Sequence, residues 1–338
     1  MMSLSKLNIS EIHKILFITL SNIGDVILTF PVIDILKKDF PQAGLFVVVG
    51  PKGEPLLKGN PYLAGVHVFD KRQSWLRSLA WLRELRKERF DLVVDLRNTA
   101  IPAFIAARYR TSFRAPRSNN THMRGQHLRK LKTVHIPRHE HPERCALFIP
   151  VRDEQFADRI VEQEIGRGRR FVVVAPGAAD NSKRWPEERF ATLCDWLAKE
   201  HATKVVFAGS LGDQATIGYI KKAMTQKSVD LSGRASLRQL AALLKMSAGA
   251  IVNDSAPMHL ASYLDIPVLA MFGPTDPAYY GPWSAKSYYL RKNATCAKCS
   301  QPKRRAAHTC MSSISVEDVM GVLNLDTPDG GMNFKQLL

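Results

Sequence analysis

Short apolar runs that are rich in β-branched residues recur along the chain and alternate with stretches of helical spacing. The apolar runs fall at 14–20, 45–50, 66–69, 90–96, 171–175, 204–208, 250–252 and 268–272. Helical spacing is found near 26–38, 75–88, 186–199, 213–224, 236–245 and 258–264. The runs are apolar at odd and even positions alike, which is typical of parallel strands covered by helices on both faces. The sequence therefore predicts an α/β protein with parallel sheets and crossover helices.

A change of composition divides this alternation into two halves. A polar helix candidate at 153–165 is followed by the run GRGRR at 166–170, which indicates a flexible basic hinge. The 338 residues are enough for two domains of ordinary size. We place the boundary between residues 150 and 169 and predict doubly wound domains at 1–160 and 161–338. Two such domains facing each other would hold a ligand between the carboxyl ends of their sheets.

The chain is strongly basic, with 48 Lys and Arg against 31 Asp and Glu and a formal net charge of +17. Such an excess points to an anionic partner, which can be a nucleic acid, a phosphorylated small molecule or an acidic membrane surface. Nine basic residues and no acidic residue lie between Arg108 and Arg138. We interpret this basic segment as a loop-rich insertion in the first domain. An ordinary solvated basic face is the alternative.

The sequence also predicts the compartment and the state of the cysteines. No apolar run approaches the ~20 residues of a membrane-spanning helix, and the early run 15–20 ends in a polar turn, so we expect a cytoplasmic protein without a signal peptide. Cys296 and Cys299 form one CxxC pair, with His308 and Cys310 nearby, and could bind zinc. We instead expect reduced, structural cysteines and no metal, because a second matched pair is missing.

Polar residues follow the first predicted strand. Gly24 permits a tight turn, and Asp25 stands at or beside the start of the next helix. Asp25 is therefore either the N-cap of that helix or a carboxylate that acts as a base. Spacing alone favours the cap. The three-glycine dinucleotide pattern is absent here, which argues against an oxidoreductase.

Two strand-end loops in the second half are suited to an anion. Small residues in the loop 176–186 let backbone N–H groups approach a phosphate that Lys183 could neutralise, although a solvated lysine in a polar connection is the alternative. Asp254 and Ser255 lie where a helix begins, and His259 follows within two turns. The alternative there is that Ser255 caps the helix and His259 is a half-buried polar residue.

Taken together and in this order, the loops resemble those of the ADP-heptose:lipopolysaccharide heptosyltransferases, a glycosyltransferase family with the GT-B fold. The matching pieces are 21–25, 183–186, 253–255 with 259–261, and 273–277. The resemblance implies two Rossmann-like domains facing a central cleft, the first for the acceptor and the second for the nucleotide sugar. It implies inverting transfer of a heptose or related sugar from an ADP-sugar to a hydroxyl of a lipopolysaccharide core acceptor.

The resemblance also implies roles for individual residues. Asp25 corresponds to the general base, Lys183 to the lysine at the donor phosphates and Asp254 to the acid near the sugar. The positions that correspond to donor-binding residues are Gly177, Ala178, Lys183, Asp213 (at the nucleotide ribose), Asp254, Ser255, Ala256 and His259. For the acceptor we expect Asn22 and Gly24, with Arg114, Arg117 and Arg124 of the basic segment. The pairs 177–178 and 256–257 depart from the residues usual in the family, which leaves the donor sugar open.

The chain contains no Asp-x-Asp, so the usual carboxylate grip on a metal–diphosphate complex is missing. We therefore expect metal-independent transfer with no cofactor besides the donor. The expected partners are an acidic glycolipid and, through peripheral contact of the basic segment, the inner membrane leaflet. A GT-B enzyme for another nucleotide sugar and an epimerase are alternatives. A nucleic-acid-binding protein that uses residues 108–138 is a third, but only Tyr109 and Phe113 could stack bases there, and we expect no nucleic acid.

Overall fold

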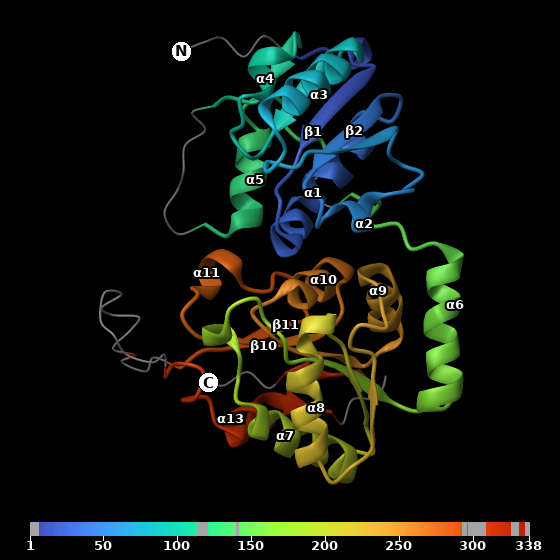
Figure 1. Cartoon of the computed structure of the whole chain (residues 1–338), viewed down its shortest axis with the longest axis vertical. Helices are drawn as coiled ribbons and strands as arrows, with labels where there is room; N and C mark the ends of the chain where they lie inside the picture. Colours follow the sequence, from blue (N-terminus) through green and yellow to red (C-terminus); the bar gives the residue numbers. More distant parts are fainter. Residues whose placement is uncertain are drawn as a thin grey trace. The chain divides into compact units, whose positions relative to one another are not determined.

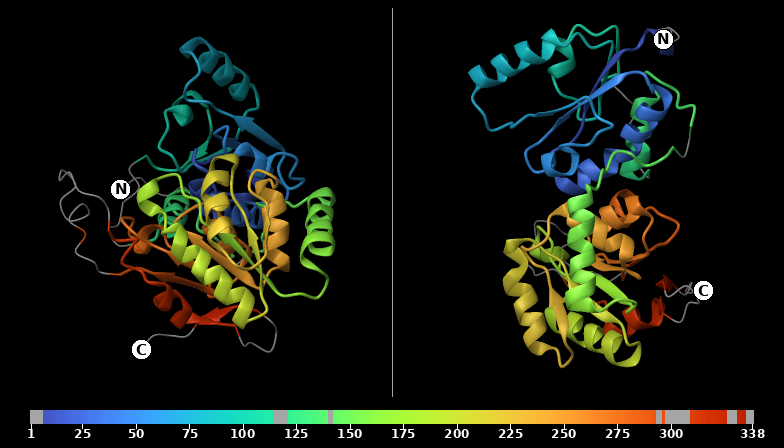
Figure 2. Two further views of the ribbon diagram at one scale, coloured as in Figure 1. Left: turned by 60° about the horizontal axis from the view of Figure 1, so that its bottom comes forward. Right: turned by 90° about the vertical axis from the view of Figure 1, so that its right-hand side faces the viewer.

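The computed structural model describes residues 7–113, 121–139, 142–292, 296, 309–325 and 331–334. The chain divides into two compact units, Met1–Phe148 and Ile149–Leu338. Each unit is a parallel sheet with helices on both faces (Figures 1 and 2). The prediction of two α/β domains is therefore confirmed.

The first unit is built on a five-stranded parallel sheet with the order β3-β2-β1-β4-β5, a doubly wound arrangement. Its strands are β1 (Lys14–Ile18), β2 (Gly44–Val49), β3 (Gly65–Val68), β4 (Leu92–Asp95) and β5 (Tyr109–Arg110). The helices are α1 (Ile23–Asp39), α2 (Glu54–Leu57), α3 (Trp75–Lys87), α4 (Ile101–Phe104) and α5 (Met123–Leu131), after a short 3₁₀ turn η1 (Ile9–Glu11). Helices α1 and α5 cover one face of the sheet, and α3 and α4 cover the other (Figures 1 and 2).

Part of the basic segment corrects the expectation of a loop-rich insertion. Residues 123–131 form α5, which packs against α1. Within α5 the side chains of His127 and Lys130 are buried, and Lys130 donates a hydrogen bond to the Asn98 side chain. The sequence did not indicate this helix, because the polar residues that it buries are of types that usually lie on the surface.

The second unit contains a six-stranded parallel sheet with the order β11-β10-β9-β6-β7-β8. Its strands are β6 (Phe171–Ala175), β7 (Lys204–Phe207), β8 (Ser228–Asp230), β9 (Gly249–Asn253), β10 (Val268–Met271) and β11 (Ser287–Leu290), with a small antiparallel pair, β12 (Leu323–Asn324) and β13 (Asn333–Phe334). The helices are α6 (Val151–Ile160), α7 (Glu187–Glu200), α8 (Gln214–Ala223), α9 (Leu237–Met246), α10 (Ala256–Leu264), α11 (Pro277–Tyr280) and α13 (Val316–Val322). A π-helical segment, η2 (Val161–Ile165), continues α6, and η3 (Asn181–Lys183) and η4 (Leu211–Asp213) are short 3₁₀ turns.

The compact units divide between residues 148 and 149, whereas the sequence placed the boundary between residues 150 and 169, with domains at 1–160 and 161–338. The difference is α6, which packs against α9 of the second unit (Figure 1). A buried ion pair fixes this contact, with Arg238 Nε 3.3 Å from Asp153 Oδ2. The glycines at 166 and 168 have positive φ values of 97° and 74°, so they make a turn into β6 within the second unit.

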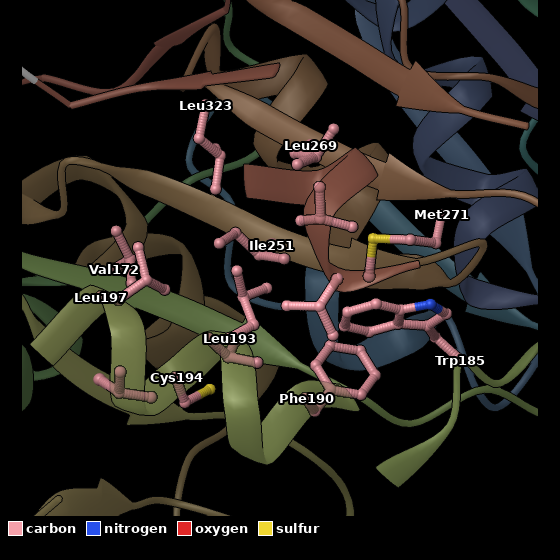
Figure 3. Packing of buried hydrophobic residues seen from close by; sticks show 14 of the residues in the cluster. Val172, Trp185, Phe190, Leu193, Cys194, Leu197, Ile251, Leu269, Met271 and Leu323 are labelled. Atoms are coloured by element: carbon pink, nitrogen blue, oxygen red, sulfur yellow. The ribbon is translucent and has the colours of Figure 1, made fainter. Parts of the chain in front are cut away.

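A large apolar cluster fixes one face of the second sheet. It joins β6, β7, β9 and β10 to α7, α8 and α13, and Figure 3 shows part of it. Trp185 lies at its edge with 1% of its surface exposed. The Trp185 ring packs edge-on against Phe190 at 4.9 Å between centroids, and its Nε1 donates to the Ile314 carbonyl at 2.9 Å. Because Trp185 is anchored in this way, the preceding residues 183 and 184 are held at the carboxyl end of the sheet.

Candidate functional site

One buried amide connects the loops at the carboxyl ends of β6 and β9, which are neighbouring parallel strands. The Asn253 side chain is fully buried; its Nδ2 donates to the Pro176 carbonyl at 2.7 Å, and its Oδ1 accepts the Trp185 N–H at 3.2 Å. Two loops that are far apart in the sequence are thus fixed together. This explains how the predicted donor residues of both loops come to lie together at the carboxyl end of the sheet.

Lys183 and Asp254 form an ion pair, with 2.7 Å between Lys183 Nζ and Asp254 Oδ2. The Lys183 side chain is 30% exposed and that of Asp254 is 6% exposed. Lys183 ends the short turn η3, in which the Ser182 N–H donates to the capping Asp180 side chain at 2.9 Å. A solvated lysine, the alternative weighed from the sequence, does not describe this arrangement. The ammonium is oriented by a buried carboxylate and keeps donor capacity for a further anion.

Gly177 and Asp213, two of the positions expected to bind the donor, lie in close contact. A Cβ atom at Gly177 would stand 2.5 Å from the Asp213 carboxyl carbon, so a side chain there would displace the carboxylate. The Asp213 Oδ2 accepts hydrogen bonds from the backbone N–H and the hydroxyl of Ser210, at 2.8 Å and 2.7 Å. This capping box holds Asp213 at the beginning of α8.

Arg184 links these residues, although the sequence analysis gave it no role. Its guanidinium donates twice to the Ala178 carbonyl, at 3.1 Å from Nε and 2.8 Å from Nη2. The same Nη2 lies 3.9 Å from Asp213 Oδ1. The one available signal was its position between Lys183 and the anchored Trp185 in a strand-end loop.

The start of α10 carries Ser255, Ala256 and His259. Ser255 occupies the N-cap position, but among the described residues its side chain makes no capping bond to the helix; its hydroxyl donates to the Asn253 carbonyl at 3.2 Å. The alternative weighed from the sequence, that the Ser255 side chain caps the helix, is therefore wrong. His259 is buried rather than half-buried, and its ring stacks on Trp283 at 5.6 Å between centroids.

The loop that begins at Gly273 lies against the lysine loop. A Cβ atom at Gly273 would stand 3.2 Å from the Ser182 carbonyl oxygen and 2.8 Å from Met311 Cγ. Only a residue without a side chain fits such an approach. The pieces of the resemblance that fall in the second unit thus converge on one end of one sheet.

In the first unit, Asp25 lies in the first turn of α1. The helix begins at Ile23 with Asn22 as its N-cap, so Asp25 is the third helical residue, and the alternative of an Asp25 N-cap is wrong. Asn22 Nδ2 donates to Asp25 Oδ2 at 3.0 Å. Gly24 lies inside the same helical turn. A carboxylate at this position is favoured by the positive end of the helix dipole.

A second carboxylate, Asp95, ends β4 beside the end of β1, and the sequence analysis did not single it out. It is buried and accepts the N–H groups of Arg97 and Thr99 at 2.8 Å and 2.6 Å. These bonds describe a turn-forming aspartate, which is a structural role. The signal that could have found it is its position at the end of a predicted strand.

Of the basic residues proposed for the acceptor, Arg124 is described and lies half-buried near the start of α5, where burial lowers the pKa of its guanidinium. Arg114 and Arg117 lie outside the described residues. One turn further on, Arg129 donates to the Thr121 hydroxyl at 2.9 Å, while its Nε and Nη2 are buried and have no hydrogen-bond partner within the described part of the chain. Burial also lowers the pKa of His127 to about 4, with His122 and Lys130 adding to the shift.

Whether the cysteine-rich segment binds a metal depends partly on residues that the structure does not describe. Cys296 and Cys310 are buried, whereas Cys299 and His308 are not described. Within the described ranges, no three His, Cys, Asp or Glu side chains gather as metal ligands would. The absence of a metal therefore stays a prediction. Among the same residues, no helix has the length and apolar character to cross a membrane.

The family model of glycosyltransferase family 9 (heptosyltransferase) matches residues 78–309. Over 286 residues the chain is 25% identical to lipopolysaccharide heptosyltransferase 3 of Escherichia coli, covering 77% of this chain and 84% of that protein. Over 335 residues it is 24% identical to lipopolysaccharide heptosyltransferase 1 of Campylobacter coli, covering 91% and 97%.

Two solved structures share the architecture. A family 9 glycosyl transferase from Veillonella parvula DSM 2008 aligns with a TM-score of 0.77 at 25% identity, covering 91% of this chain and 95% of that one. The E. coli ADP-heptose lps heptosyltransferase II aligns with a TM-score of 0.72 at 21% identity, covering 91% and 96%. The match of the family model over more than half of the chain, together with the paired α/β units, shows that this protein is a glycosyltransferase of family 9 with the GT-B fold.

Proposed function

We propose that the protein transfers a heptose from ADP-heptose to a hydroxyl group of a lipopolysaccharide core, with inversion at the anomeric carbon. The relatives named above are lipopolysaccharide heptosyltransferases. The E. coli heptosyltransferase WaaC, which shares the fold with a TM-score of 0.68, was solved with ADP-2-deoxy-2-fluoro heptose. The observation that carries the proposal is the oriented Lys183–Asp254 pair at the carboxyl end of the second sheet.

In this proposal the donor diphosphate binds at Lys183 and at the first turn of α10. The Ser255 hydroxyl is engaged with Asn253 rather than with the helix, Pro257 has no N–H, and the Met258 N–H donates to the Ser255 carbonyl at 3.1 Å. The Ala256 N–H at the start of α10 is therefore the backbone donor available to a phosphate oxygen. Asp254 keeps the ammonium in place before the donor arrives. The same ammonium stabilises the charge that develops on the diphosphate as it leaves, which is the main requirement of a metal-independent transfer.

The nucleotide would lie along Gly177, Ala178 and Asp213. Because Gly177 has no Cβ atom, the nucleotide can come close to the backbone there. The Asp213 carboxylate has Oδ1 beside Arg184, while its Oδ2 accepts the hydrogen bonds from Ser210. We assign the ribose hydroxyls to Asp213, since a carboxylate accepts their protons in hydrogen bonds. His259, buried beside Trp283, then supports the diphosphate loop from within α10.

Asp25 is proposed as the general base on the acceptor side. It takes the proton of the acceptor hydroxyl as the new oxygen–carbon bond forms and the bond from the anomeric carbon to the diphosphate breaks. Asn22 orients the carboxylate through its 3.0 Å hydrogen bond, and the neighbouring Gly24 adds no side chain to the first helical turn. The proton thus ends on Asp25 and the electron pair of the broken bond on ADP.

The acceptor itself is proposed to be an acidic glycolipid. Arg129, with two buried donors unpartnered among the described residues, and the half-buried Arg124 supply positive charge on α5. Arg114 and Arg117 extend this assignment as predictions. A protein that adds sugars to such a lipid works from the cytoplasmic side, in peripheral contact with the inner membrane leaflet.

Release of ADP tests the proposal directly. Purified protein is incubated with ADP-heptose and a heptose-deficient core acceptor, and ADP and the extended acceptor are quantified; UDP- and GDP-sugars serve as controls. We expect acceptor-dependent ADP release from ADP-heptose. Transfer from another nucleotide sugar would overturn the donor assignment, and donor conversion without any acceptor would instead indicate an epimerase.

A further inference from the structure

Helix α3 presents two apolar faces, of which the first unit uses one. Leu85 is buried, and Trp81 and Leu82 pack against the apolar cluster on this face of the sheet, where the Trp81 ring lies 4.9 Å from Phe69. Trp75, Leu76 and Leu79 are 70%, 61% and 36% exposed. At 100° per residue these three side chains share one arc of the helix, turned away from the buried face. A tryptophan and two leucines in adjacent exposed positions indicate a binding surface.

Basic residues continue the same arc toward the C-terminal end of α3. Arg83, Arg86 and Lys87 follow the exposed apolar residues at helical spacing, and with them form what we call the α3 patch. Between residues 70 and 89 the chain has seven basic and three acidic residues. Two of the acids, Glu84 and Glu88, are paired with Lys87 and Lys14 at 2.7 Å and 2.8 Å. These pairs also neutralise Lys87 and Lys14, so the positive charge around the patch rests on the arginines, Arg83 and Arg86 among them.

The end of the patch opens into a cationic recess of about 410 Å³. It is lined by Arg86, Arg89 and Arg108, with Phe90, Ile105 and other residues forming its wall. The carboxylate in the recess, Asp91, accepts the N–H groups of His13 and Lys14 at 2.8 Å and 2.9 Å. Helix α4 packs beside α3 and adds Phe104, which is 49% exposed.

We propose that the α3 patch docks on an anionic phospholipid bilayer. Trp75, Leu76 and Leu79 enter the interfacial region, while the arginines at the C-terminal end of α3 bind lipid phosphates. An apolar stripe bordered by arginines has the charge and the aromatic residue that an anionic membrane surface selects. The patch lies on the face of the sheet opposite α5 (Figures 1 and 2), so it is a different surface from the basic segment. The inference concerns where the protein works and does not depend on the donor or the acceptor.

Vesicle sedimentation with the full-length protein tests the proposal. We compare vesicles of phosphatidylcholine alone with vesicles that contain phosphatidylglycerol, in the absence of any sugar donor. The test variant is Trp75→Ser/Leu76→Ser/Leu79→Ser. Its matched control is Phe113→Ser/Ile136→Ser, which removes two side chains of the basic segment that are each 70% exposed. A charge variant, Arg83→Glu/Arg86→Glu, tests the phosphate contacts.

We expect wild type and the control to bind the anionic vesicles, and the test variant to bind them at least about tenfold more weakly. The charge variant should lose affinity for anionic vesicles, and its residual binding should depend less steeply on salt than that of wild type. Retained melting temperature and retained transfer to a lipid-free acceptor show that the fold and the reaction are intact.

Three results would overturn the proposal. In the first, the test variant binds as well as wild type; in the second, only the Phe113/Ile136 control loses binding, which assigns the membrane to the basic segment. In the third, sedimentation without vesicles shows that wild type is a dimer and the test variant is a monomer. The patch would then bind a second copy of the chain rather than a membrane. A failure of glycosyl transfer alone leaves vesicle binding unaffected and counts against the proposed function instead.

Discussion

The carboxyl ends of the two sheets are organised differently. In the second unit, Asn253 joins two loops, Lys183 is paired with Asp254, and Arg184 holds the Ala178 carbonyl. In the first unit, the hydrogen bond that orients Asp25 comes from Asn22, three residues earlier in the same helical turn. The second unit thus fixes its charges through contacts between distant segments, and the first unit through local ones. We expect this difference if the second unit binds phosphate in a preorganised site, while the carboxylate of the first unit adjusts its position to the acceptor hydroxyl.

The largest effect is expected from Asp25→Asn. Asparagine keeps the size of the side chain and can still accept the Asn22 hydrogen bond, so the fold and donor binding should remain. Without a base, turnover should fall by ~10² to 10⁴. Steady-state kinetics together with donor titration measure both quantities. Near-normal turnover would eliminate Asp25 as the base, and Asp254 would become the next candidate.

The comparison of the two units predicts unequal costs for two asparagine substitutions. Asn253→Ala leaves a buried carbonyl at Pro176 and a buried N–H at Trp185 without partners, and should destabilise the protein by about 2 to 3 kcal/mol. Asn22→Ala removes a local bond on a partly exposed turn and should cost about 0.5 to 1 kcal/mol. Urea unfolding compares them. Equal losses in the free energy of unfolding would show that the side-chain contacts at the second site stabilise the protein no more than those at the first.

Acid should weaken the first unit through His127. Its pKa of about 4 lies below the value of about 6.5 in the unfolded chain, because burial and the neighbouring His122 and Lys130 disfavour the charged ring. Between these values the unfolded chain binds more protons, so stability falls as the pH falls. The contribution is about 2 kcal/mol between pH 7 and pH 5. His127→Gln should remove this part of the pH dependence; an unchanged slope in urea titrations would contradict the assignment.

A smaller effect is expected from Gly177→Ala. The added methyl group would push the Asp213 carboxylate out of place, and donor affinity should fall roughly tenfold. The control is Gly218→Ala in α8, where a Cβ atom meets nothing within 4 Å. That variant should keep donor affinity and gain about 0.5 to 1 kcal/mol of stability from its helical position. Equal donor affinities in the two variants would remove Gly177 from the donor site.

The strands that the sequence predicted are those buried within the sheets and the edge strand β3. Besides the small pair β12 and β13, the strands that were missed are β5, β8 and β11, which all lie at edges of the two parallel sheets. Of these, β5 and β8 are the shortest strands of the two sheets, and they carry polar residues, such as Arg110 and Asp230, because one side of an edge strand has no neighbour. Their sequence therefore lacks the continuous apolar pattern that identified the others.

The candidate site was predictable where strand ends determine it. Lys183 and Asp254 follow β6 and β9 within their loops, and adjacent parallel strands bring such residues together. The bond from Arg184 to the Ala178 carbonyl was not predictable, since it depends on how the loop folds back. The hydrogen bond from the Ser255 hydroxyl to the Asn253 carbonyl was not predictable either, because a serine at the start of a helix ordinarily caps the helix.

The central claim is that Lys183 binds the donor diphosphate, and calorimetric titration of ADP-heptose measures this most directly. The variants are Lys183→Ala and, as a control, Lys199→Ala, whose side chain is 73% exposed on α7. We predict that Lys183→Ala weakens donor binding by ten- to a hundredfold, as expected for the loss of about 1.5 to 3 kcal/mol in a charge-assisted contact, while Lys199→Ala binds as wild type does. Equal donor affinity in wild type and Lys183→Ala would contradict the account.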